Sequence, residues 1–215
     1  MSKRPAFIWD LDGTLLDSYK IIVPSMHRAL LGFGIDMKEE DIHQVLITYS
    51  LGVFLSQVEG KYGIPSDVLR EKFSEINDAE ALNTEAIPNA AEILAYLKGE
   101  GIRSYVYTHK GVTTLPVLKK LGLYAFFDDI ITSENGFPKK PDPAAIVHLI
   151  QKHGLDKEKC FYVGDRTLDV ACACNAGIKS ILYLPENSLA KADGRQTYIV
   201  KDLLEIKDIV KPFIR

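Results

Sequence analysis

Residues 6–17 read AFIWDLDGTLLD, and this segment places a short apolar run directly before two carboxylates, Asp10 and Asp12. A short apolar run bounded by a turn signal is typical of a buried strand. The two carboxylates therefore follow the carboxyl end of a predicted strand, where open α/β sheets bind ligands. Gly13 allows the backbone to approach an anion closely. An ordinary turn also favours Asp and Gly, so this segment alone leaves a purely structural role open.

The rest of the core shows apolar, β-rich runs that alternate with segments of helical period. Residues 90–97, for example, carry apolar side chains at i, i+3, i+4 and i+7, between Pro88 and Gly99. The predicted strands are residues 6–9, 102–108, 129–132, 160–163, 179–184 and 197–200. This order predicts a Rossmann-like parallel sheet flanked by helices.

A long stretch without strand signals separates the first two predicted strands. It contains helical patterns only, such as Leu51 with Phe54, Leu55 and Val58. A connection of this length is too long for a loop. We therefore predict an α/β catalytic core of residues 1–16 and 86–215, with an inserted all-helical cap subdomain of residues 17–85.

Charge and cysteine content restrict the class of partner. The net charge of −3 gives no electrostatic footprint for nucleic acid or an anionic membrane. No apolar run is long enough for a signal-peptide core or a membrane span. Three cysteines without a secretory signal indicate reduced thiols in the cytoplasm. We expect a cytoplasmic monomer or homodimer that binds a small anionic molecule through local groups.

Two further signals suit the binding of a phosphoryl group. Thr108 ends the second predicted strand, where its hydroxyl can donate to a phosphoryl oxygen, with the amide of His109 close behind. Lys139 and Lys140 precede a predicted helix, where a lysine can neutralise a phosphate. Taken singly, the threonine also fits a turn cap, and a lysine here also fits a solvated surface.

A fourth signal is the segment YVGDRTLD at residues 162–169, in which a buried strand ends in Gly-Asp and a second acid follows one helical turn later. Asp165 and Asp169 would add to the charge of Asp10 and Asp12, and such crowding is unfavourable unless a cation lies among the carboxylates. Hard carboxylate oxygens favour magnesium over zinc. The segment predicts a Mg²⁺ site.

The four signals occur in order, each at the carboxyl end of a predicted strand, and together they supply a nucleophile, an acid, an anion clamp and metal ligands. This set resembles the haloacid dehalogenase superfamily, in its phosphoglycolate-phosphatase-like branch with a helical cap. The resemblance covers essentially the whole chain. It implies a magnesium-dependent phosphatase that hydrolyses a small phosphorylated metabolite, phosphoglycolate-like or sugar-phosphate-like, through an aspartyl phosphate.

The resemblance also implies catalytic roles. Asp10 would be the nucleophile, and Asp12 would protonate the leaving oxygen and then activate water as a base. Thr108 and Lys140 would hold the transferring phosphoryl group, and only the match to Lys-Pro-x-Pro selects Lys140 over Lys139.

Metal and substrate contacts follow from the same resemblance. The Mg²⁺ ligands would be the Asp10 carboxylate, the Asp12 backbone carbonyl and Asp165, with Asp169 binding directly or through water. The expected substrate contacts are Gly13, His109, Arg166, Ser50 and Gly52, the last two in a cap segment placed over the active site. A rim position for Arg166 and a helix start at residues 50–52 are the structural alternatives.

Several rival activities share parts of this pattern. A sugar phosphomutase uses the same four motifs and remains the main alternative. A dehalogenase needs no magnesium and usually lacks the second aspartate, while a phosphonatase needs a Schiff-base lysine, for which Lys20, Lys38 and Lys61 have no distinctive setting. A signalling receiver domain carries its phosphorylated aspartate on a later strand and lacks a helical insertion of this size.

Overall fold

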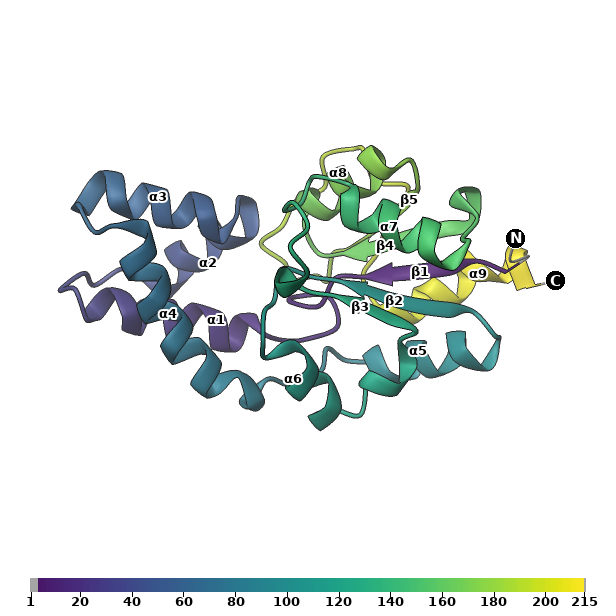
Figure 1. The fold of residues 1–215 in the computed structure, drawn as a ribbon, viewed down its shortest axis with the longest axis horizontal. Helices are drawn as coiled ribbons and strands as arrows, with labels where there is room; N and C mark the ends of the chain where they lie inside the picture. The colour runs from purple at the N-terminus through teal and green to yellow at the C-terminus, as the bar shows by residue number, and fades with distance from the viewer. Residues whose placement is uncertain (1–3, 215) are drawn as a thin grey trace. The chain divides into compact units, whose positions relative to one another are not determined.

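The computed structural model describes residues 4–214 of the 215-residue chain. These residues form two compact units. One consists of the chain up to Asp17 and again from Ala86 onward, and the other is Ser18–Glu85. Figure 1 shows the first unit as a sheet between helices and the second as helices alone. The helical unit is thus inserted between the first and second strands of the sheet.

Six parallel strands form the sheet, in the order β3-β2-β1-β4-β5-β6. Their bounds are β1 Ala6–Trp9, β2 Arg103–Tyr107, β3 Asp129–Ile131, β4 Cys160–Gly164, β5 Lys179–Tyr183 and β6 Tyr198–Val200. Each strand overlaps a predicted one, and the predicted α/β fold class is confirmed. The order places β1 beside β4, where the direction of strand addition reverses, and sheets of this type bind ligands beyond that point.

Helices cover both faces of the sheet. Their bounds are α5 Ala90–Gly99, α6 Thr114–Lys120, α7 Ala144–His153, α8 Thr167–Ala176 and α9 Ile206–Ile214. Successive strand residues point to opposite faces. On one face, Ile8 packs in a buried cluster with Leu149 of α7 and Ala173 of α8. On the other face, the ring of Phe161 lies 5.7 Å from that of Phe213 of α9. Burial on both faces explains why the strands read as continuous apolar runs.

The helical unit has its own hydrophobic core. Its helices are α1 Tyr19–Leu31, α2 Glu39–Thr48, α3 Leu51–Tyr62 and α4 Ser66–Glu80. One buried cluster joins all four, with Met26 from α1, Leu46 from α2, Leu55 from α3 and Phe73 from α4. The apolar residues recur at helical spacing, so each helix buries one face against the others.

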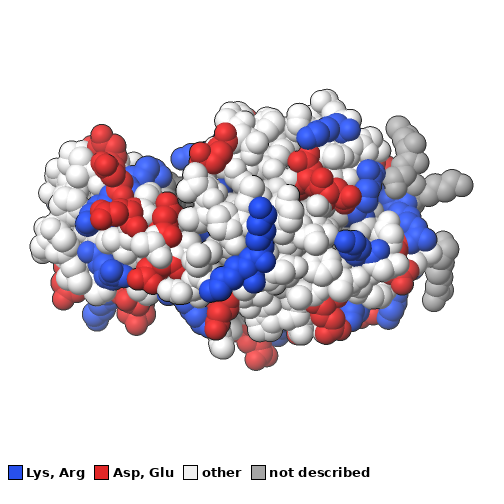
Figure 2. Space-filling model, turned by 60° about the horizontal axis from the view of Figure 1, so that its bottom comes forward, with Lys and Arg blue, Asp and Glu red and all other residues white. Residues whose placement is uncertain are grey.

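The surface and the helix lengths bear on possible partners. Basic and acidic side chains are interspersed on the face drawn in Figure 2, in keeping with the net charge of −3. Within residues 4–214, no helix combines the length and the apolar character that crossing a membrane requires.

Candidate active site

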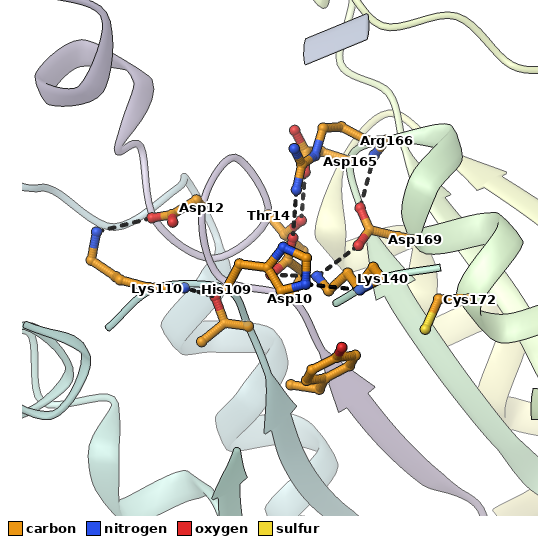
Figure 3. Close-up of polar contacts among 12 residues, drawn as sticks. Asp10, Asp12, Thr14, His109, Lys110, Lys140, Asp165, Arg166, Asp169 and Cys172 are labelled. Carbon is orange, nitrogen blue, oxygen red and sulfur yellow. Dashed lines mark hydrogen bonds and ion pairs between the residues drawn. The ribbon is translucent and has the colours of Figure 1, made fainter. Parts of the chain in front are cut away.

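The ends of three neighbouring strands bring the predicted site residues together. Trp9 pairs in register with Val163, so β1 and β4 end at nearly the same level. Asp10 follows β1 directly, and its N–H donates to the Val163 carbonyl at 2.8 Å. Thr108 follows β2, and Asp165 follows β4. The parallel register therefore places Asp10, Thr108 and Asp165 at one edge of the sheet, the region that Figure 3 shows.

A tight turn after Asp10 positions the segment that carries Asp12. Gly13 has a φ of +79°, a conformation that favours glycine. Its N–H donates to the Leu16 carbonyl at 2.8 Å, and the Leu11 carbonyl accepts from the Leu16 N–H at 2.9 Å. Gly13 is thus part of the turn itself, and its contact with substrate stays a prediction. Within the turn, the Thr14 hydroxyl points to Asp165 Oδ1 at 3.4 Å.

Lys140 lies in the loop before α7 and reaches two buried carboxylates. Its Nζ is 2.9 Å from Asp10 Oδ1 and 2.8 Å from Asp169 Oδ1, and its side chain is 0% exposed. Burial alone would lower the pKa of Lys140, but the two carboxylates raise it above its ordinary value. The neighbouring Lys139 is exposed. Geometry therefore places Lys140, and not Lys139, against the proposed nucleophile.

Three buried carboxylates form a cluster suited to a hard metal ion. Asp10, Asp165 and Asp169 each offer an oxygen, and these oxygens lie within 4.8 Å of one another. Burial raises the pKa of Asp165 to about 7, against the opposing charge of Arg166. Burial also raises the pKa of Asp10, although Lys140 opposes it. Asp10 Oδ2 accepts no hydrogen bond from residues 4–214, and Arg166 Nη2 is 3.8 Å away.

These observations fit a divalent cation. Lys140 pairs with Asp10 and Asp169, and Arg166 lies 3.8 Å from Asp10, while burial and the two neighbouring carboxylates raise the pKa of Asp165. A cation among the carboxylate oxygens would favour the ionised form of Asp165. All donors in the cluster are carboxylate oxygens, which suit magnesium.

Asp169 is positioned by the start of α8. Its Oδ2 accepts the Arg166 N–H at 3.1 Å, and its Oδ1 faces Lys140. Burial acts to raise the pKa of Asp169, but Lys140 and Arg166 outweigh it and lower the pKa. The residue packs directly on Gly164, where a Cβ would lie 2.3 Å from Asp169 Cβ. Only glycine at position 164 therefore permits this placement of Asp169.

The carboxylate of Asp12 is not part of the cluster of three buried carboxylates. Its Oδ1 pairs with Lys110 Nζ at 3.1 Å, and Figure 3 shows the two side chains pointing toward one another. The Lys110 side chain is 6% exposed, and its backbone N–H donates to Thr108 Oγ1 at 3.2 Å. Lys110 was not among the predicted site residues. Its position two residues after Thr108 indicates a more cationic site, but no contact was predicted for it.

The remaining predicted contacts divide between the two units. His109 Nε2 accepts the Lys140 N–H at 2.9 Å, which requires a neutral ring protonated on Nδ1. Burial, together with Lys140 and Arg166, lowers the pKa of His109 to about 3, so the ring stays neutral. Ser50 and Gly52 belong to the helical unit, where Ser50 Oγ accepts the Val53 N–H at 3.2 Å and caps α3. The helix start considered for residues 50–52 is thus present, while substrate contact stays a prediction.

The fold and the site together show an α/β protein with clustered carboxylates beyond the carboxyl edge of a parallel sheet. Residues 7–183 match the family model of haloacid dehalogenase-like hydrolases, and the chain belongs to that family. The resemblance inferred from the four motifs is confirmed, and so is the enzyme class.

Named relatives cover four fifths of the chain or more. A phosphoglycolate phosphatase from Agrobacterium fabrum is 30% identical over 184 residues, which cover 82% of this chain and 79% of the relative. A phosphoglycolate phosphatase from Nitrosococcus oceani is 27% identical and covers 98% of both chains. The crystal structure of a predicted phosphoglycolate phosphatase from Haemophilus somnus has a TM-score of 0.83 at 22% identity, covering 98% of this chain and 100% of that one. This last likeness supports the fold.

Proposed function

We propose that the chain is a magnesium-dependent phosphatase that hydrolyses a small phosphorylated metabolite through an aspartyl-phosphate intermediate. The observation that carries the proposal is the buried Asp10 carboxylate, whose Oδ1 is held by Lys140 while Oδ2 accepts no hydrogen bond from residues 4–214. A carboxylate that is held through one oxygen, and whose other oxygen accepts no hydrogen bond, is suited to nucleophilic attack through that second oxygen.

The residues divide the reaction into two displacements. Asp10 Oδ2 attacks phosphorus, the bond from phosphorus to the ester oxygen breaks, and Asp12 gives that oxygen a proton. Water then attacks the phosphorus of the aspartyl phosphate, Asp12 takes a proton from the water, and inorganic phosphate leaves with Asp10 restored. Lys140 and the Thr108 hydroxyl stabilise the negative charge on the transferring group. Asp10, Asp165 and the Asp12 carbonyl, with Asp169 directly or through water, would hold Mg²⁺, which would supply further positive charge.

The relatives, and not the site itself, support the proposed substrate class. Both named curated relatives are phosphoglycolate phosphatases, so we propose phosphoglycolate or a similar small phosphate ester. A sugar phosphomutase would use the same residues but would return the phosphoryl group to a sugar. The cytoplasmic location and the monomeric or homodimeric state stay predictions.

The proposed function is tested by measuring phosphate release from a panel of phosphorylated metabolites and p-nitrophenyl phosphate, with and without Mg²⁺. We expect activity to disappear in chelator and to return with Mg²⁺, because the clustered carboxylates require a cation. Release of inorganic phosphate without need of a bisphosphate would distinguish the phosphatase from a phosphomutase. Full activity in thoroughly metal-stripped protein would refute the metal assignment.

A paired variant makes this metal test specific. Asp165→Asn is nearly isosteric but removes one carboxylate of the cluster, so half-maximal activity should need at least about tenfold more Mg²⁺. The control is Asp208→Asn, since the Asp208 side chain is 75% exposed on α9. Circular dichroism should show both variants folded. Equal Mg²⁺ requirements in the two variants would exclude Asp165 as a ligand.

We also propose that Ser50 takes part in the choice of substrate. Ser50→Ala removes the N-cap of α3 and should lower the free energy of unfolding by about 1 kcal/mol, whereas Ser50→Thr keeps a capping oxygen. If Ser50 contacts substrate, both variants should change kcat/KM for the natural ester and leave p-nitrophenyl phosphate nearly unaffected. A loss shared by all substrates, and found only in Ser50→Ala, would make Ser50 a structural residue alone.

A further inference from the structure

We propose that three uncharged rings, those of Tyr107, Tyr162 and His109, form a cage that positions Lys140 for phosphoryl transfer. The inference rests on the proposed function, in which Lys140 holds the transferring phosphoryl group. None of the three rings belongs to the predicted catalytic set. They act through Lys140, and so they are positioning residues and not catalytic ones.

Two of the rings, whose centroids are 6.2 Å apart, lie side by side next to the ammonium group. Lys140 Nζ lies 5.2 Å from the ring centroid of Tyr107 and 5.2 Å from that of Tyr162. Both tyrosines are almost fully buried, at 2% and 1% exposed. An aromatic face attracts a cation most strongly where water is excluded. The Lys140 ammonium is therefore held by two ring faces in addition to the carboxylates of Asp10 and Asp169.

Hydrogen bonds connect the hydroxyls of the two tyrosines to neighbouring backbone carbonyls. The Tyr162 hydroxyl donates to the Tyr107 carbonyl at 2.9 Å and lies 3.4 Å from Asp169 Oδ1, the oxygen that also faces Lys140. The Tyr107 hydroxyl donates to the Pro138 carbonyl at 3.0 Å. Tyr107 thus connects strand β2 to the loop that carries Lys140.

His109 fixes the backbone of the same lysine. Its Nε2 accepts the Lys140 N–H at 2.9 Å, and its ring meets that of Tyr107 edge-on, with centroids 6.0 Å apart. The main chain and the ammonium of Lys140 are consequently both held from the end of β2. This contact gives His109 a positioning role, while its predicted substrate contact stays a prediction.

The absence of charge on the rings has a chemical reason. A further carboxylate beside Lys140 would neutralise the charge that the phosphoryl group needs, and a further cation would repel the ammonium. Neutral rings restrict the position of the Lys140 ammonium without neutralising the charge that the phosphoryl group needs. A clamp held in advance needs little rearrangement when charge develops in the transition state.

Matched substitutions test separately the ring of Tyr107, the hydroxyl of Tyr107 and the hydrogen-bond acceptor of His109. Tyr107→Phe keeps the ring and Tyr107→Leu removes it, while His109→Gln keeps an acceptor of similar reach and His109→Leu does not. With p-nitrophenyl phosphate and saturating Mg²⁺, we expect both leucine variants to lower kcat by about tenfold or more with KM little changed. Tyr107→Phe and His109→Gln should stay within about threefold of the wild type.

A double-mutant cycle then tests whether the rings act through Lys140. In a Lys140→Ala background, His109→Leu and Tyr107→Leu should cause little further loss, because the group they position is gone. The cage would be refuted if the leucine substitutions lowered kcat equally in the wild type and in Lys140→Ala. It would also be refuted if Tyr107→Phe and His109→Gln lowered kcat as much as the leucine variants. If Tyr107→Leu does not fold in thermal denaturation, the His109 pair decides the question.

The same experiment distinguishes failure of the cage from failure of the proposed function. If Lys140→Ala turned over substrate at the wild-type rate, the role of Lys140 in holding the transferring phosphoryl group would be refuted. A large loss in Lys140→Ala together with full activity in both leucine variants would leave the proposed function intact and refute the cage alone.

Discussion

Asp10→Asn is expected to abolish phosphatase turnover, lowering kcat by roughly 10⁴-fold or more, the scale on which covalent nucleophiles contribute. The amide is nearly isosteric with the carboxylate, but its oxygen is a poor nucleophile. The variant also lacks the charge that pairs with Lys140. Turnover of p-nitrophenyl phosphate measures the loss, and circular dichroism checks the fold. Asp36→Asn is the control, because the Asp36 side chain is 85% exposed.

The covalent intermediate can be observed directly. Rapid acid quenching during turnover, followed by mass spectrometry, should find phosphate on the peptide that contains Asp10. Two successive in-line displacements should also retain configuration at a chiral phosphorus, whereas direct attack by water inverts it. Inversion, or substantial hydrolysis by Asp10→Asn, would make water the nucleophile and leave Asp10 as a metal ligand only.

Lys140→Ala is expected to lower kcat by about 10³-fold, since it removes a charged donor from the transition state. Lys139→Ala should remain near the wild type, because Lys139 is exposed while the Lys140 side chain is 0% exposed. Lys140→Ala also leaves the carboxylates of Asp10 and Asp169 without the ammonium group that they share. Loss of one partner from a buried ion pair should lower the free energy of unfolding by about 3–5 kcal/mol.

Separating the two effects requires kinetics at a temperature where both variants are folded. Chemical denaturation gives the stability change, and steady-state kinetics in Mg²⁺ gives kcat. A large loss in Lys139→Ala with little change in Lys140→Ala would show that the two lysines have been assigned in the wrong order.

The ends of β1, β2 and β4 could be predicted because each of these strands ends in apolar or aromatic residues and is followed directly by a polar residue. That rule placed Asp10, Thr108 and Asp165 at one edge, since parallel strands end on the same side of a sheet. The choice of Lys140 over Lys139 needed the motif, because a sequence does not show which of two adjacent lysines is buried.

The contacts of Lys110 and His109 could not be predicted in the same way. Lys110 meets Asp12 across 98 positions, and His109 meets the Lys140 backbone across 31. Such pairs depend on the direction of single side chains after the sheet and its loops have formed. The same holds for Tyr107 and Tyr162, which read as ordinary strand residues until their rings are seen beside the ammonium.

The contact between Gly164 and Asp169 has a consequence for how this chain can vary. A Cβ at position 164 would lie 2.3 Å from Asp169, which no ordinary packing accommodates. Every other amino acid carries a Cβ, so every point mutation at this codon that changes the residue displaces Asp169. Any substitution of Gly164 is therefore expected to disturb the site, and evolutionary change in this enzyme should occur at other positions.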